Sequence, residues 1–116
     1  MSRVVAESTQ AMVVCDGRVA SRTIIHANQE FERLTGFSRE SALGHSLAQL
    51  LRPPGGQFEW ERVDAVLAGN KPWRKALPAA RKDGTVFWAD LHVYPLKHDD
   101  VATHWVGVIT DVTDHL

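Results

Sequence analysis

The chain lacks several features that mark specialised proteins. Its 116 residues include one cysteine, Cys15, which excludes an intramolecular disulfide and a cysteine-rich metal site. No apolar run approaches the roughly 18 residues of a membrane-spanning helix, and no signal peptide is recognisable at the start. The formal net charge of −1 gives no reason to expect nucleic acid or an anionic membrane as a partner. We therefore expect a cytoplasmic protein in a reducing compartment.

Sequence signatures of catalysis and metal binding are also missing. The chain has no G-x-S-x-G, no phosphate-binding glycine loop and no H-E-x-x-H. Asp83, Asp90 and Asp111 are scattered acids that suit a turn, a sheet surface and a cap. No two of the six histidines are spaced as metal ligands on a helix; they are His26, His45, His92, His98, His104 and His115. The sequence predicts neither an enzyme nor a metal site.

The residues that are present predict one α+β domain over residues 11–116, with residues 1–10 as an N-terminal cap or linker segment. Two short strands come first, at Ala11–Asp16 and Thr23–Asn28. Three long strands come last, at Pro72–Lys82, Thr85–Lys97 and Thr103–Val112, and hairpin connections at Asp83-Gly84 and His98–Ala102 join them.

Helical patterns fill the middle of the chain. Asn28 is placed to cap a helix that Gly36 ends, and short helical pieces follow at 38–44 and 46–51. Phe58–Ala68 is amphipathic through Trp60, Val63, Val66 and Leu67. The order β-β-α-α-α-α-β-β-β predicts a five-stranded antiparallel sheet with helices covering one face.

Three stretches of this sequence resemble the PAS sensory fold. They are IIHANQEFERLTGFSRESALG (Ile24–Gly44), RKDGTVFW (Arg81–Trp88) and WVGVITDVTD (Trp105–Asp114). The resemblance spans about residues 11–114. It implies that Asp111 and Thr113 make hydrogen bonds at an output junction, where the chain leaves for an adjoining helix.

Within that family, the sequence motifs are most similar to those of the LOV photoreceptors, but the LOV flavin and cysteine signature is missing. In the resemblance, Leu47 takes the place of the photoactive cysteine, and apolar residues replace the other polar anchors; these residues are Ala48, Leu51, Ala79, Ala89 and Ile109. Buried flavin atoms without partners would each cost on the order of 1–3 kcal/mol. We therefore expect flavin to be disfavoured and predict no cofactor.

Haem is disfavoured as well, since haem-binding PAS sensors of the oxygen-sensing type carry their axial histidine on the long helix before the last three strands. Phe58–Ala68 contains no histidine. His45, beside a helix end, is better interpreted as a surface residue.

Strand alternation predicts an apolar interior under the helices. If Ala89 faces the helices, then so do the neighbours that share its side of the sheet. We predict that a ligand pocket, if present, is lined by Leu34, Leu47, Leu51, Val63, Leu67, Leu77, Ala79, Ala89, Leu91, Trp105 and Ile109. Two interpretations stay open: Trp105 and the leucines fill this space, or the small residues leave a cavity for an unidentified small apolar ligand. Dense packing of interiors favours the filled core.

The opposite side of the sheet predicts an interaction face of Trp88, His92, Tyr94, Val106 and Val108. So broad an apolar patch is usually covered, which predicts a homodimer or a covering helix. Together these features predict a sensory and dimerisation module in a bacterial-type signalling protein. Its covalently linked effector would be, for example, a histidine kinase or a cyclic-dinucleotide enzyme. The alternative is a ligand-free protein–protein interaction scaffold.

Overall fold

The computed structural model describes residues 10–18 and 22–115, so residues 1–9 of the predicted cap or linker segment lie outside the described residues. Two strands open the fold, β1 (Ala11–Asp16) and β2 (Ile24–Ala27). Four helices follow: α2 (Gln29–Thr35), α3 (Arg39–Ala42), α4 (Leu47–Leu51) and α5 (Gln57–Leu67). Three strands and a 3-10 turn complete it: β3 (Trp73–Ala80), β4 (Val86–His98), β5 (Val101–Asp111) and η1 (Thr113–His115).

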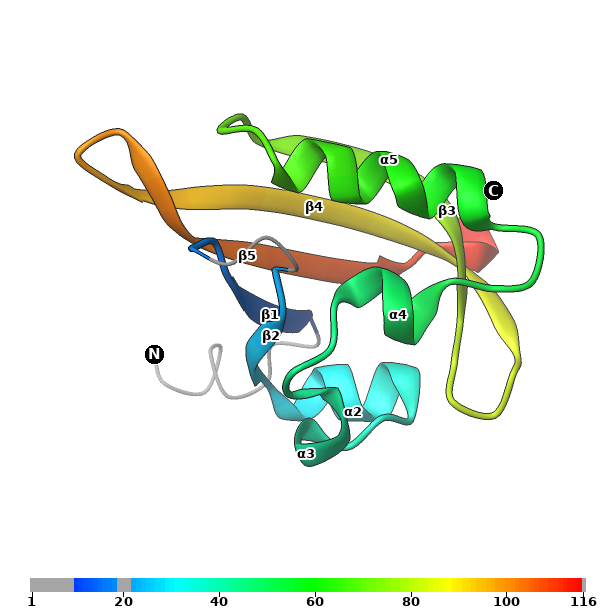
Figure 1. Cartoon of the computed structure of the whole chain (residues 1–116). Helices are drawn as coiled ribbons and strands as arrows, with labels where there is room; N and C mark the ends of the chain where they lie inside the picture. The colour runs from blue at the N-terminus through cyan, green and yellow to red at the C-terminus, as the bar shows by residue number, and fades with distance from the viewer. Residues whose placement is uncertain (1–9, 19–21, 116) are drawn as a thin grey trace.

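The strands form one antiparallel sheet in the order β2-β1-β5-β4-β3. Helices α2–α5 gather on one side of it, with α4 and α5 in front of the sheet in the view of Figure 1. The predicted α+β architecture is therefore confirmed. Among the described residues, no helix combines the length and hydropathy needed to span a membrane.

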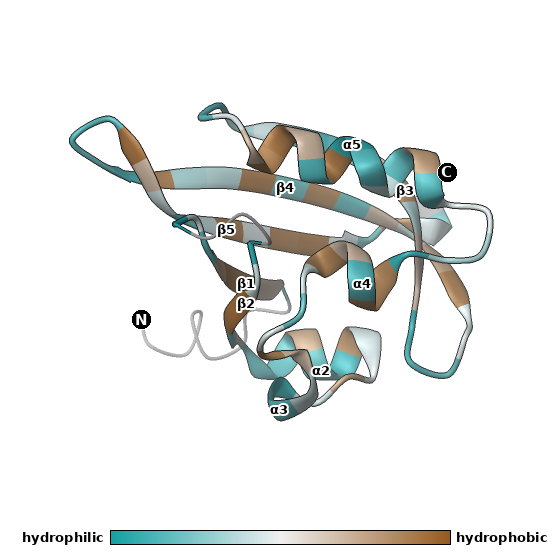
Figure 2. Cartoon of the chain, viewed as in Figure 1, coloured by the Kyte–Doolittle hydropathy of each residue, from teal (hydrophilic) through white to brown (hydrophobic). Residues whose placement is uncertain are grey.

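The two sides of the sheet follow from the alternation along β4. Phe87, Ala89, Leu91 and Val93 are buried, whereas the residues between them are exposed or half-buried. Figure 2 shows the corresponding change between hydrophobic and hydrophilic positions along this strand. Successive side chains of a strand point to opposite faces of the sheet. The buried residues of β4 therefore face the helices, and the residues between them lie on the outer face.

The Asn28 side chain joins the first sheet segment to the first helix. Its Oδ1 accepts hydrogen bonds from the backbone N–H of Phe31, as a helix N-cap, and from the backbone N–H of Met12 on β1, both at 2.9 Å. Gly36 ends the same helix at a φ of 80°, a conformation that favours glycine. Both roles agree with the sequence pattern.

Except for β1, the strand bounds differ from the sequence-based ones by one or two residues. The connection between β4 and β5 is tighter than the expected His98–Ala102 loop, because Asp99 and Asp100 both adopt positive φ (52° and 65°) and close a two-residue turn. At the sheet edge, β3 starts at Trp73 and ends at Ala80. Pro78 lies within this edge strand, and its carbonyl oxygen accepts a 2.8 Å hydrogen bond from Trp60 Nε1 of α5.

Candidate functional site

The predicted pocket residues do come together, in one buried cluster between the helices and the inner face of the sheet. Leu34 is the exception, since it is half-buried and packs at the margin of the cluster. Leu77 lies opposite Ala89 and Leu91 lies opposite Ile109 in the strand register. Ten of the predicted residues are 0–2% exposed: Leu47, Leu51, Val63, Leu67, Leu77, Ala79, Ala89, Leu91, Trp105 and Ile109.

Gly107 lies at the centre of the inner face and shows how closely α4 approaches the sheet. A Cβ atom at this position would lie 3.1 Å from Val13 Cγ2, 3.5 Å from Leu47 Cδ1 and 3.7 Å from Val93 Cγ1. The space that this small residue leaves is therefore taken by its neighbours. This contact supports the filled-core interpretation around Gly107.

Two tryptophans in the interior differ in hydrogen bonding although each is 1% exposed. Trp60 Nε1 donates to the Pro78 carbonyl oxygen. Trp105 Nε1 is buried and has no partner among the described residues. A buried N–H without an acceptor costs about 1–3 kcal/mol, so Trp105 Nε1 is an unsatisfied polar group of the interior.

Cys15 belongs to the same buried cluster. It does not lie on α4, where Leu47 takes the place of the photoactive cysteine of LOV photoreceptors. It lies on β1, opposite Trp105 in the β1–β5 register, and is 1% exposed. Burial raises the pKa of its thiol to about 12. The thiol is therefore protonated at neutral pH and a poor nucleophile. No group of three or more acidic, histidine or cysteine side chains in the described part of the chain is arranged to hold a metal ion.

The predicted interaction face lies on the outer side of the sheet, with one difference. Trp88 is 42% exposed, and His92, Tyr94 and Val108 are half-buried. Val106, however, is only 6% exposed; it lies on the central strand β5, between Val14 of β1 and Tyr94 of β4. Arg74 reaches Asp90 on this side through both Nε and Nη2, at 3.1 and 2.7 Å.

The predicted output junction is a set of hydrogen bonds at the end of β5. Asp111 Oδ1 accepts from the Thr113 backbone N–H at 3.0 Å and from its hydroxyl at 2.6 Å. The Thr113 hydroxyl oxygen in turn accepts from the Trp88 backbone N–H at 2.9 Å, and the Val112 N–H donates to the Trp88 carbonyl oxygen at 2.9 Å. The bonds from Thr113, with a smaller contribution from Arg81, lower the pKa of Asp111.

The sequence patterns gave Arg81 no role, yet this residue connects the junction to the helices. Its Nη2 lies 3.0 Å from Asp111 Oδ2, and its Nε donates to the Leu34 carbonyl oxygen of α2 at 3.0 Å. Its guanidinium carbon also lies 4.4 Å from the centroid of the Phe87 ring. The only available signal was a basic residue at the start of the RKDGT turn; its partners are 47 and 30 residues away in sequence.

Comparison with known proteins identifies a family and several relatives. The profile described as "PAS domain" matches residues 9–114. A blue-light-activated histidine kinase of Rhizobium johnstonii is 30% identical over 105 residues, which make up 90% of this chain and 30% of that protein. This chain therefore spans less than a third of the length of that relative.

Two solved structures are close in fold and sequence. An RNA-binding light-oxygen-voltage receptor is 27% identical, with a TM-score of 0.86 over 98% of this chain and 33% of that one. A structure described as "Flavin Analogue Sheds Light on Light-Oxygen-Voltage Domain Mechanism" is 28% identical, with a TM-score of 0.82 over 99% of this chain and 87% of that one.

These relatives overturn one expectation. They include light-oxygen-voltage and blue-light-activated proteins, and one of the structures concerns a flavin analogue. The expectation that flavin is disfavoured, with no cofactor predicted, is therefore wrong. It rested on the apolar replacements at six positions, and it left out the apolar contact area and backbone groups that also hold a ligand.

Paired Trp→Phe substitutions test the difference between the two interior indoles. Trp60→Phe leaves the Pro78 carbonyl oxygen without its donor, whereas Trp105→Phe removes an N–H that has no acceptor. We expect Trp60→Phe to lower the free energy of unfolding by about 1–2 kcal/mol more than Trp105→Phe does. Urea denaturation measures both. An equal or larger loss in Trp105→Phe would mean that its N–H has an acceptor in solution.

The lowered pKa of Asp111 predicts a pH dependence. A depressed folded-state pKa contributes stability that is fully present above the unfolded value of about 3.9 and is lost as pH falls through the folded value. We expect Asp111→Asn to lower stability at pH 7 by less than about 1 kcal/mol, since the side chain is 35% exposed.

Below about pH 4 the difference from wild type should shrink, because Asp111 itself then becomes neutral. Denaturation at a series of pH values checks this. Asp99→Asn, at the exposed β4–β5 turn, is the control for loss of one formal charge. A difference between Asp111→Asn and wild type that stays constant down to pH 2 would contradict the expectation.

Proposed function

We propose, for a chain that belongs to the PAS domain family, a sensory and dimerisation function: the state of its interior or of its partner contacts is relayed through the sheet to an adjoining helix and effector. The family is shown by the profile match, and a histidine kinase is among the relatives of this chain. The relay, the homodimer and the nature of the effector form our proposal.

The observation that carries the relay is the position of Trp88. Its backbone is bonded in both directions to the segment that follows β5, through Thr113 and Val112. Its side chain lies on the outer face, 42% exposed. A partner that contacts this indole therefore contacts a residue bonded to the exit of the chain, and a shift of β4 relative to β5 changes both together.

A second connection leads from the helices to the same exit. Arg81 joins the α2 carbonyl of Leu34 to the Asp111 carboxylate, which holds Thr113. We infer that a movement of α2 over the interior reaches Asp111 and Thr113 through this side chain. The effector after the junction would be of the histidine-kinase or cyclic-dinucleotide-enzyme type, by analogy with the Rhizobium johnstonii kinase.

Flavin is the first ligand to test, by analogy with the light-oxygen-voltage relatives. The buried apolar side chains Leu51, Val63, Leu91 and Ile109 suit the faces of a flat ring system, and Trp105 Nε1 is a buried donor without an acceptor. When bound, a flavin supplies absorption of blue light. The residues would bind and shield the ring, and water is excluded because they are 0–1% exposed.

The outer face is tested by self-association. We expect Trp88→Ala to weaken dimerisation by at least about tenfold, since buried tryptophans dominate interfaces, and Val108→Asp to abolish it, since it would bury an unpaired charge. Sedimentation equilibrium measures both. Phe58→Ala is the matched control: Phe58 is a 68% exposed aromatic residue on α5, on the other side of the sheet. If both outer-face variants associate and signal as wild type does, this face is not the transmission surface.

An absorption spectrum and a native mass separate the sensory function from the alternative, a ligand-free interaction scaffold. We expect a purified sensor to carry added mass, and a yellow sample with flavin absorption would identify that ligand. A colourless protein of its sequence mass alone would favour the scaffold, for which the close packing around Gly107 is the specific support. Loading with added flavin before measurement controls for loss of ligand during purification.

A further inference from the structure

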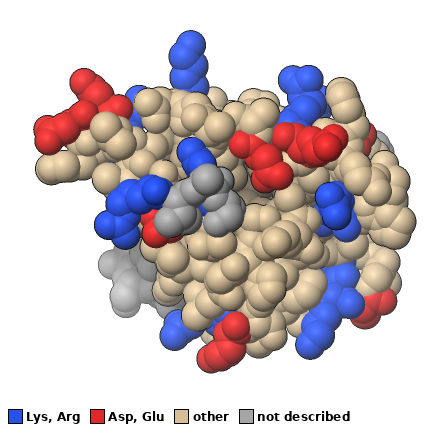
Figure 3. Space-filling view, in the orientation of Figure 1, with Lys and Arg blue, Asp and Glu red and all other residues tan. Residues whose placement is uncertain are grey.

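A cleft of about 480 Å³ lies between the C-terminal end of α2 and the turn that joins β3 to β4. Three basic residues and one acidic residue are among those that line it; the full set is Arg33, Thr35, Gly36, Arg81, Lys82 and Asp83. A cleft of this size suits a small molecule. In Figure 3, basic and acidic side chains lie at the lower right, the end of the molecule that carries the β3–β4 turn in Figure 1.

The two walls of the cleft are joined to each other by backbone contacts. The Lys82 backbone N–H donates to the Thr35 carbonyl oxygen at 2.8 Å, which bonds the turn to the last residue of α2. A Cβ atom at Gly36 would lie 3.4 Å from Lys82 Cβ, so the two segments approach closely. Thr35 is buried, and its hydroxyl donates to the Phe31 carbonyl oxygen at 2.8 Å. The fold itself therefore holds the walls in place.

Two cations of the β3–β4 turn have donors to offer a ligand. The Lys82 side chain is exposed, and its ammonium group has no hydrogen-bond or ion-pair partner in the part of the chain that the structure describes. Arg81 donates through Nε to the Leu34 carbonyl oxygen, through Nη2 to Asp111 and, at 3.4 Å, through Nη1 to Thr85 Oγ1. Because each terminal nitrogen of a guanidinium carries two N–H groups, one on each remains available for a ligand.

The acidic partners of the two arginines lie in a neighbouring hollow. Arg33 pairs with Glu30 on α2, and Arg81 pairs with Asp111 at the end of β5. Glu30 and Asp111 line a separate hollow of about 320 Å³, and Arg33 lines both this hollow and the cleft. The cleft is therefore the basic side of this arrangement of charges, and the hollow is the acidic side.

Asp83, the acidic residue of the cleft, is bonded within its own turn. Its Oδ1 accepts from the backbone N–H of Thr85 at 2.9 Å and from the Thr85 hydroxyl at 2.7 Å. These bonds, with a smaller contribution from Arg81, lower the pKa of Asp83, so its carboxylate is ionised at neutral pH. It repels an anion in the cleft, and the three basic side chains attract one.

We propose that this cleft binds the carboxylate or phosphate group of a small molecule, and that the bound group competes with Asp111 for Arg81. Lys82 supplies a charge without a partner, while Arg81 and Arg33 supply N–H groups that match the oxygens of either anion. Because two anions then share one guanidinium, the pair between Arg81 and Asp111 weakens. The site does not depend on the proposed relay. A consequence for an effector does rest on it, since in that proposal Arg81 connects α2 to Thr113 through Asp111.

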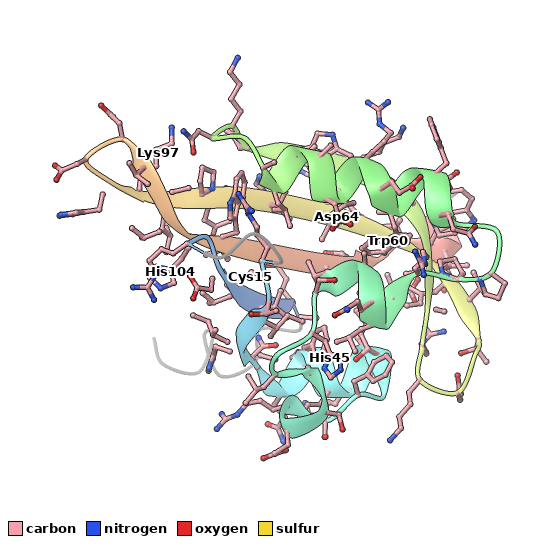
Figure 4. All side chains as sticks on the ribbon, in the orientation of Figure 1. Cys15, His45, Trp60, Asp64, Lys97 and His104 are labelled. Carbon is pink, nitrogen blue, oxygen red and sulfur yellow. The ribbon has the colours of Figure 1, made fainter. Side chains whose placement is uncertain are left out.

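Binding is tested with sodium sulfate as a simple anion, with sodium chloride at equal ionic strength as the salt control. Backbone amide resonances of the whole chain are followed during titration. We expect saturable shifts at residues 35–36 and 81–85, and about tenfold weaker binding in Lys82→Gln. Lys97→Gln is the matched control and should bind as wild type does, because Lys97 lies at the other end of β4, beside the β4–β5 turn (Figure 4). Absence of saturable shifts, or equal binding by the two variants, would overturn the site.

Acetate and inorganic phosphate, titrated in parallel, distinguish the two sources of the anion. At least one of them should shift the same residues as sulfate does, and the one that binds more tightly identifies the group that the cleft prefers. If neither gives saturable shifts at residues 35–36 and 81–85, the proposed ligand chemistry is wrong.

The competition for Arg81 is tested by removing the charge of its partner. We expect Asp111→Asn to bind sulfate about fivefold more tightly than wild type does, because Arg81 then has no carboxylate to neutralise it. Asp99→Asn, at the exposed β4–β5 turn, is the control for loss of one formal charge and should have little effect. Unchanged or weaker sulfate binding in Asp111→Asn would overturn the competition.

Thermodynamic linkage requires the converse effect on Asp111. Saturating sulfate should raise the pKa of this carboxyl, which bonds from Thr113 and, to a smaller extent, the charge of Arg81 hold low. The Asp111 carboxyl carbon resonance, followed through pH titrations with and without sulfate, measures the shift. Glu30 and Asp83, the other acids that line the hollow and the cleft, are followed in the same spectra. An Asp111 pKa that sulfate leaves unchanged would overturn the competition, whereas failure of the relay would appear in the outer-face variants and leave sulfate binding intact.

Discussion

The alternation along β4 is the constraint on which the rest of the structure depends. Thirteen residues in one strand place Phe87, Ala89, Leu91 and Val93 under the helices and Trp88 on the opposite side. A shift of one residue in register would exchange these sets, exposing the core and burying Asp90. The register is held on both flanks, by β3 and by β5. Interior and surface are therefore coupled through a single strand.

The hydrogen bonds at the end of β5 depend on that same strand. Trp88 is bonded through its backbone to Val112 and Thr113, and Arg81, just before β4, holds Asp111. The junction is exposed, so its individual ion pair contributes little to stability. The contribution of the junction is geometric, because contacts from α2, β4 and the end of β5 converge there within a few residues. Such a meeting point suits a module that passes a conformational change onward.

Much of this was readable from the sequence, because its decisive signals are local. Asn28, Gly36 and Asp83-Gly84 mark a cap, a helix end and a turn, and alternation assigns the sides of β4. What could not be read depends on tertiary contact. The roles of Arg81 and the burial of Val106 are set by residues distant in sequence, and the Asp99-Asp100 turn requires positive φ at two non-glycine residues. The flavin expectation failed because it weighed six side chains and left out the rest of the apolar interior.

Pro78 has a consequence for how this domain meets other chains. It lies in β3, the outermost strand, where an unprotected backbone would be a template for pairing with another sheet. Proline supplies no N–H at this point, and Trp60 already occupies its carbonyl oxygen. The middle of this edge therefore offers a foreign strand neither donor nor acceptor. Strand addition, the route to fibrous aggregates, is therefore disfavoured at this point of the β3 edge.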